Sequence, residues 1–239
     1  MKRVLSFIID CSKSFVLEFH SLARFYKFIR HGCNDHTNYD EHNAPVILIH
    51  GIYGHKAFWN EFRKHLEFAG VNNIHVIQLH NSQLGVKDHA NQLKDHINVV
   101  LGNNRERGVK LIGASRGGVV AAYFTEFVAE DIGIDVKAVV TIGSPLSGTL
   151  CANVLPRVVA RDMGYRSSFI IKLREKILEN CKTHYYHIAT RTDPVIIPYH
   201  SALTGKDKNK EFLVSGQSHN SLLFDHSVIH RVISWLQNC

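Results

Sequence analysis

The chain has 239 residues, a length that suits one α/β domain, and 45% of them are hydrophobic, which is enough for a full core. Only 21% are charged, and both signs are mixed, which excludes an intrinsically disordered chain. The formal net charge of +7 favours anionic surfaces. Nucleic acid is not expected as a partner, because the sequence contains no arginine-rich run, zinc-finger spacing or RNA-binding aromatic motif.

The five cysteines occur at irregular spacings without a CxxC pair, so neither a zinc site nor a redox dithiol is expected. Reduced thiols are the simplest interpretation, and a disulfide between Cys151 and Cys181 is left open. The 17 histidines include no HExxH or other metal-ligand spacing. We therefore expect neither a metal nor an organic cofactor.

Residues 1–30 predict an amphipathic helix with a basic flank. Residues 1–32 carry a net charge of +4, and the apolar positions advance in steps of three and four, which places them on one helix face: Phe15, Phe19, Leu22, Tyr26 and Ile29. The first apolar run is too short to span a bilayer, and no cleavage site follows it. Two interpretations stay open, a helix packed on the main domain and an interfacial membrane anchor. Residues 31–44 are polar and predict a linker.

Strands alternate with helices from Pro45 onward. Short apolar runs predict strands at 46–49, 74–79, 109–112, 136–145, 184–193 and 211–216, and helices are expected at 56–68, 87–101, 117–130 and 227–237. This alternation predicts an α/β fold with a doubly wound, mostly parallel sheet. We expect two parts, an N-terminal helix and linker at 1–44 and one domain at 45–239. In such sheets, ligands bind at the carboxyl ends of the strands.

The segment Gly113-Ala114-Ser115-Arg116-Gly117 matches G-x-S-x-G, directly after one predicted strand and before a predicted helix. This context is the one that the nucleophile-elbow motif requires, because a sharp strand-to-helix turn projects the serine hydroxyl above the sheet. The sequence therefore predicts Ser115 as a catalytic nucleophile.

From Pro45 to the C-terminus, the sequence resembles the lipase-like branch of the α/β-hydrolase superfamily. The resemblance rests on HGIYG at 50–54, LIGASRGG at 111–118, VVTIGSPLSGT at 139–149, RTDPVIIP at 191–198 and QSHNSLL at 217–223. Ala114 departs from the pattern, since many lipases have histidine there. The resemblance implies an α/β-hydrolase fold and a Ser-Asp-His triad without a cofactor.

The order of the triad in this family assigns the other two residues. Asp193 comes just after the apolar part of a predicted strand, residues 185–189, and would be the acid. His219 lies between the last strand and the last helix and would be the general base. Asp225 is a weaker candidate for the acid, and His226 and His200 are fallback candidates for the base. The resemblance also implies an oxyanion hole made by the backbone N–H groups of Ile52 and Arg116.

Three aromatic residues near the predicted oxyanion loop are candidates for substrate binding: Tyr53, Phe58 and Trp59. Ordinary core packing is the alternative. Residues 147–183 fall outside the strand pattern, and insertions at this point in the family form a short helical cap over the site. A helix that covers a face of the sheet is an equally good interpretation of this segment.

The sequence thus predicts a serine hydrolase that cleaves carboxylic esters, with a lipid or another acyl ester as substrate. A thioesterase, amidase, acyltransferase or glycolipid-anchor deacylase could use the same triad. A catalytically silent membrane-binding module is the alternative from another class. We expect a cytoplasmic or peripherally membrane-associated protein, and export without a signal peptide is left open.

Overall fold

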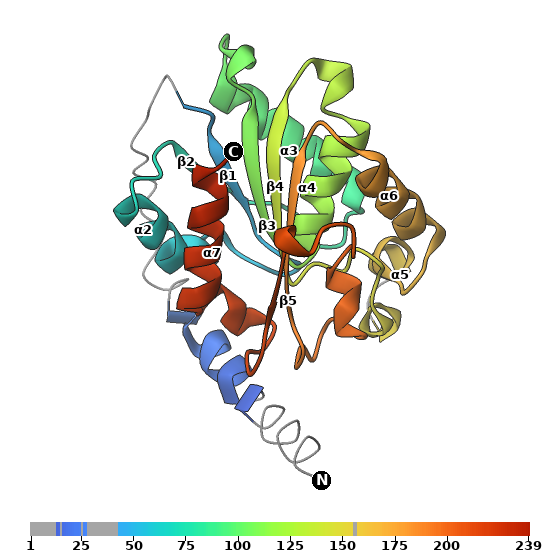
Figure 1. Ribbon diagram of the computed structural model, residues 1–239. Coiled ribbons are helices and arrows are strands. Elements are labelled where there is room, and N and C mark those ends of the chain that lie inside the picture. Colours follow the sequence, from blue (N-terminus) through green and yellow to red (C-terminus); the bar gives the residue numbers. More distant parts are fainter. Residues whose placement is uncertain (1–12, 15, 25, 28–42, 155–156) are drawn as a thin grey trace.

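A six-stranded parallel sheet in the order β2-β1-β3-β4-β5-β6 is the centre of the molecule (Figure 1). The computed structural model describes residues 13–14, 16–24, 26–27, 43–154 and 157–239, and the counts below refer to them. The strands are β1 (Val46–Ile49), β2 (Ile74–Ile77), β3 (Val109–Ala114), β4 (Val136–Ile142), β5 (His184–Thr190) and β6 (Glu211–Val214). The α-helices in the domain are α2 (Asn60–Phe68), α3 (Val86–Leu101), α4 (Arg116–Phe127), α5 (Arg157–Met163), α6 (Ser168–Glu179) and α7 (His226–Gln237). Short 3-10 helices are η1 (Lys56–Trp59), η2 (Arg105–Arg107), η3 (Glu130–Ile132), η4 (Leu150–Val154), η5 (Tyr199–Ala202), η6 (Lys208–Lys210) and η7 (Asn220–Phe224).

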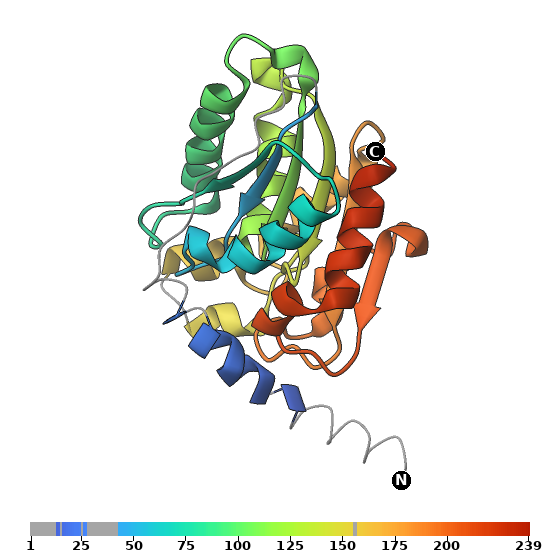
Figure 2. The ribbon, with the colours of Figure 1, turned by 90° about the vertical axis from the view of Figure 1, so that its left-hand side faces the viewer.

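Helices cover both faces of the sheet, and this explains why the strands read as continuous apolar runs. Successive side chains of a strand point to opposite faces. Ile47 and Ile49 pack into the core beneath α3, α4 and α6, whereas Val46 and Leu48 pack into the core beneath α2 and α7. Figure 2 shows these two helix layers edge-on. The predicted α/β fold with helices on both faces is confirmed.

The order of the strands reverses between β1 and β3. The chain leaves β1 toward β2 on one side, and it leaves β3 toward β4 on the other side. Such a switch point creates a crevice at the carboxyl ends of the two strands, where α/β proteins bind ligands. His50 follows β1 and Ser115 follows β3, so both flank this crevice.

Helix α6, in the predicted cap segment, lies against a face of the sheet. Its buried side chains Ile170, Leu173 and Ile177 belong to the same core as α3 and α4. Phe169 stacks on Tyr123 of α4 with ring centroids 5.5 Å apart. This part of the segment therefore follows the face-covering interpretation. Cys151 and Cys181 are free thiols, so the disulfide that the sequence left open is not formed.

The N-terminal helix lies at the carboxyl edge of the sheet (Figures 1 and 2) and is helical at residues 13–14, 16–24 and 26–27. It contacts the domain through polar side chains, whereas its apolar stripe points to solvent. Phe19, Leu22 and Tyr26 are 70%, 52% and 66% exposed. The expectation that Phe15 and Ile29 share this face lies outside the described residues.

Candidate active site

Ser115 occupies the sharp turn between β3 and α4. Its backbone has φ 54° and ψ −125°, in the left-handed half of the map that L residues rarely adopt. Small neighbours make the turn possible. A Cβ at Gly113 would overlap the backbone of Gly117 and Gly118, and a Cβ at Gly117 would overlap the carbonyl of Ile49. The G-x-S-x-G pattern therefore reflects the close approach of α4 to β1 and β3.

His219 and Asp193 come together from the loops that follow β6 and β5. Nδ1 of His219 lies 2.8 Å from Oδ2 of Asp193, and both side chains are buried. The other carboxylate oxygen of Asp193 accepts hydrogen bonds from the backbone N–H groups of Val195 and Ile196, both at 2.8 Å. A carboxylate held in this way fixes the ring of His219 with Nδ1 as the donor, which leaves Nε2 free to accept a proton.

The surroundings of His219 favour its protonated form. Burial of the imidazole lowers its pKa, but the charge and hydrogen bond of Asp193, together with the charge of Glu18, outweigh burial and raise the pKa above 6.5. The same interactions stabilise the imidazolium that forms when His219 accepts a proton.

His50 fixes the loop that follows β1. Its Nε2 accepts a hydrogen bond from the backbone N–H of Leu79 at 3.0 Å, and its Nδ1 donates to the carbonyl of Gly51 at 2.8 Å. Burial lowers the pKa of His50 to about 4, so the ring is neutral at physiological pH. The imidazole thus ties the loop carrying Ile52 to the end of β2.

The two predicted oxyanion donors flank the serine from different elements. Ile52 lines the cavity beside Ser115, and Arg116 is the first residue of α4, where backbone N–H groups are unpaired within the helix. The side chain of Arg116 is buried and donates to the carbonyls of Ser82 and Leu84. This arrangement holds the start of α4 against the loop after β2.

A cavity of about 180 Å³ opens beside the serine. Ser115 and His219 both line it, as do several apolar side chains: Ile52, Phe58, Trp59, Ile142, Val195 and Leu223. Trp59 is fully buried, and its indole N–H has no hydrogen-bond partner among the described residues. Tyr53, the third aromatic candidate, does not line this cavity and is 60% exposed.

The fallback candidates have other surroundings. Asp225 caps α7 by accepting from the backbone N–H of Val228 and also accepts from the amide of Gln217. His226 and His200 are exposed and do not line the cavity. Among the described residues, no group of three or more His, Cys, Asp or Glu side chains is arranged to hold a metal ion.

Sequence reasoning missed three residues beside this site. Ser14 and Glu18 from the N-terminal helix contact the loops of Asp193 and His219, and Asn220 donates hydrogen bonds to the carboxylate of Glu18. No local pattern in the sequence could have revealed these contacts, because their partners lie about 180 to 200 positions away.

A family model described as palmitoyl protein thioesterase matches residues 45–186. The matched range includes Ser115 and ends before Asp193 and His219. No curated protein matches the chain.

Solved structures share the fold at low sequence identity. Lipase B of Aspergillus fumigatus is 15% identical with a TM-score of 0.70, over 85% of this chain and 55% of its own. The mature lipase BlEst2 of Bacillus licheniformis is 16% identical with a TM-score of 0.62, over 86% and 95% of the two chains. The lin2722 gene product of Listeria innocua is 15% identical with a TM-score of 0.65, over 82% and 95%. At these identities the likeness concerns the α/β-hydrolase fold alone.

Proposed function

Because the chain belongs to the palmitoyl protein thioesterase family, we propose that it hydrolyses acyl esters or thioesters, with Ser115 as nucleophile, His219 as base and Asp193 as acid. One observation carries the proposal. The serine of a strained strand-to-helix turn shares a cavity with an imidazole that is hydrogen-bonded to a buried carboxylate. A nucleophile, a base and an acid that orients the base are the groups that acyl transfer through a covalent intermediate uses in Ser-His-Asp hydrolases.

The proposed reaction has two halves. Oγ of Ser115 attacks the acyl carbonyl while Nε2 of His219 takes the hydroxyl proton, and the N–H groups of Ile52 and Arg116 bind the oxyanion. The tetrahedral intermediate then expels the alcohol or thiol, which receives the proton from His219. Water, deprotonated by the same imidazole, attacks the acyl-enzyme and releases the carboxylic acid.

The family assignment favours a thioester over an oxygen ester as the substrate, so the leaving group would be a thiol. The acyl side meets apolar walls at Phe58, Trp59 and Leu223. A cavity of about 180 Å³ is smaller than the roughly 300–1,000 Å³ of most ligand pockets. The cavity therefore accommodates the reacting end of the acyl group, and the rest of a long chain would lie outside it.

Hydrolysis of two matched substrate series tests the proposal. One series is the p-nitrophenyl esters of graded acyl chains, and the other is the N-acetylcysteamine thioesters of the same acyl chains. Wild type is compared with Ser115→Ala and with Ser234→Ala, which removes an exposed hydroxyl on α7. We expect turnover by wild type and Ser234→Ala, with the loss of Ser115 lowering kcat by at least about 10³-fold.

Two results would contradict the hydrolase proposal. Equal activity of Ser115→Ala and wild type would remove the serine from the chemistry. Inactivity of wild type on both series, together with retained binding to vesicles, would favour a silent membrane-binding module.

We also propose that the apolar stripe of the N-terminal helix contacts an anionic lipid surface. The stripe consists of Val16, Phe19, Leu22 and Tyr26, each more than half exposed. Exposed basic side chains, Lys13, Arg24 and Lys27, lie on the same helix and suit anionic headgroups. No helix among the described residues has the length and apolar content needed to cross a bilayer. A helix lying along the surface would bring the membrane next to the cavity that Ser115 lines.

A further inference from the structure

We propose that Ser14 and Glu18 of the N-terminal helix are positioning residues that hold together the two loops bearing Asp193 and His219. The inference rests on the proposed function, because it assumes that these two residues are the acid and the base. It adds a role for a helix that lies outside the residues matched by the family model.

Ser14 contacts both loops with one hydroxyl. Its Oγ lies 2.7 Å from the carbonyl of Thr192 and 3.2 Å from the carbonyl of Gln217, and the side chain is 2% exposed. Thr192 precedes the acid, and Gln217 comes two residues before the base. The hydroxyl therefore connects the backbone of the two loops directly beside the triad candidates.

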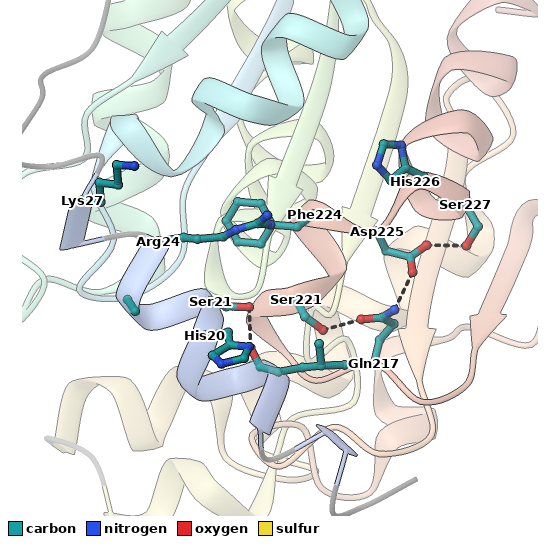
Figure 3. Close-up of a pocket in the computed structure, with 12 residues that line it drawn as sticks. His20, Ser21, Arg24, Lys27, Gln217, Ser221, Phe224, Asp225, His226 and Ser227 are labelled. Atoms are coloured by element: carbon teal, nitrogen blue, oxygen red, sulfur yellow. Dashed lines mark hydrogen bonds between the residues drawn. The ribbon is translucent and has the colours of Figure 1, made fainter.

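The backbone carbonyl of Gln217 links the two loops through hydrogen bonds. It also accepts hydrogen bonds from the hydroxyls of Thr190 and Thr192, both at 2.8 Å. The side chain of Gln217 is held in turn by Ser221 and Asp225, as Figure 3 shows. A fixed Gln217 limits the positions that the following residues, including His219, can take.

Glu18 holds the other side of the base. One carboxylate oxygen accepts from the backbone N–H of Asn220 at 3.0 Å, and the other accepts from its side-chain amide. Asn220 directly follows His219 and begins η7. Because Ser14 and Glu18 are four residues apart, they lie on the same side of the helix. Their contacts therefore lie on both sides of the base in sequence, at Gln217 and at Asn220.

The orientation of the helix argues against simple packing. A helix that only covers a domain buries its apolar face, but this one turns its apolar stripe outward and its hydrogen-bonding groups inward. A cavity of about 750 Å³ lies between the later turns of the helix and the η7–α7 region, lined by Leu17, Arg24 and Phe224 among others (Figure 3). The contacts made by Ser14 and Glu18 are thus local to the two catalytic loops.

Glu18 also acts on His219 through its charge. The charged groups that raise the pKa of His219 are Asp193, from the loop after β5, and Glu18, from the helix. His50 lines the same cavity but is neutral. Loss of the Glu18 charge should therefore lower the pKa of His219, an effect that packing alone would not produce.

The test compares Glu18→Gln and Ser14→Ala with two matched controls. Glu130→Gln removes an exposed carboxylate that pairs with Lys182 elsewhere, and Ser21→Ala removes a buried hydroxyl of the same helix, which among the described residues bonds to the carbonyl of Leu17. We expect each test variant to lower kcat about 10- to 100-fold, because small displacements of reacting groups are costly, with little change in KM. We expect both controls to match wild type.

Two pH measurements complete the test. In Glu18→Gln, the acid limb of kcat/KM and the pKa of His219 from NMR titration should both move to lower pH. The NMR signal is assigned as the one that disappears in His219→Gln.

Unchanged kcat and an unchanged acid limb in Glu18→Gln and Ser14→Ala would overturn the inference. The NMR titration separates this failure from that of the proposed function, because it needs no turnover. A lowered pKa of His219 in a protein inactive on every ester would support the contact and contradict the hydrolase proposal.

Discussion

Nδ1 of His219 lies 2.8 Å from Oδ2 of Asp193, although 26 positions separate the two residues in sequence. The parallel sheet makes this contact possible, because β5 and β6 are neighbours and both loops leave from the same edge. The backbone N–H groups of Val195 and Ile196 orient the carboxylate before any substrate arrives. A fixed carboxylate of this kind selects one tautomer of the imidazole.

Asp193→Asn should therefore lower kcat by about 10³- to 10⁴-fold with little change in fold, because the amide no longer stabilises the protonated imidazole or its tautomer. Asp225→Asn is the matched comparison. It should change stability by only a few tenths of a kcal/mol, because asparagine caps helices about as well as aspartate, and it should lower kcat far less than Asp193→Asn does. Steady-state kinetics and thermal unfolding are measured for both variants. A larger loss of kcat in Asp225→Asn than in Asp193→Asn would make Asp225 the acid.

The raised pKa of His219 predicts the pH profile of the wild type. The base must be neutral to accept the serine proton, so kcat/KM should fall as the pH drops through the pKa of His219. Burial lowers this pKa, but Asp193 and Glu18 raise it by more, so the midpoint of the acid limb should lie above 6.5. A pH series at constant ionic strength measures it. A midpoint below 6 would mean that another group limits the rate.

His50 should make folding stability depend on pH. Its pKa is about 4 in the folded chain and 6.5 when exposed, so below 6.5 the unfolded chain binds a proton that the folded chain does not. Stability should fall as the pH drops from 6.5 toward 4, and this residue alone accounts for about 2 kcal/mol between pH 7 and 5. Urea titrations at both pH values should show a smaller loss for His50→Gln. An equal loss would exclude His50 as the source.

Gly51 is the contact between the predicted oxyanion loop and the serine. A Cβ at this position would lie 3.0 Å from Cβ of Ser115 and 3.4 Å from the carbonyl of Ala114. Gly51→Ala should displace the loop or the serine and lower kcat by about 10- to 100-fold. Gly205→Ala is the control, since it strains a positive φ in open space away from the site and should affect stability only. Equal kcat for both variants would show that the loop tolerates the extra methyl group.

The apolar stripe should determine binding to vesicles. Phe19→Gln with Leu22→Gln should weaken sedimentation with anionic phosphatidylserine vesicles by at least about 10-fold, because burying each side chain is worth roughly 1.5–3 kcal/mol. Binding of the wild type should also weaken with added salt. Val99→Gln, which removes an exposed apolar side chain from α3, should bind as wild type does. Unchanged binding of the double variant would assign vesicle contact to another surface.

Local pattern in the sequence was enough to predict where the three triad candidates lie on the sheet. Ser115, Asp193 and His219 each follow an apolar strand, so their positions on the sheet edge could be inferred from strand assignment and family order. Tyr53 shows the limit of this reasoning. Its place beside the predicted oxyanion loop favoured a role in the acyl pocket. In the structure, Tyr53 has a positive φ of 53°, and its side chain is exposed.

The orientation of the N-terminal helix could not be read from its sequence. The apolar period defines a face, but it does not say whether that face meets the protein or solvent. The side that faces the domain includes Ser14 and Glu18, whose partners lie about 180 to 200 positions further along the chain. Serine and glutamate within a helix are ordinary solvated residues, so nothing local marks these two as contacts.

The N-terminal helix presents an apolar stripe to solvent and hydrogen-bonds to the loops of Asp193 and His219, so the proposed membrane contact and the proposed active site would be linked. If a lipid surface binds the stripe more tightly when Ser14 and Glu18 are engaged, the membrane acts as an effector of the active site. Thermodynamic linkage then requires the reverse effect of equal size. A reversibly bound acyl analogue that orders His219 would tighten binding to vesicles by the same factor by which vesicles tighten binding of the analogue.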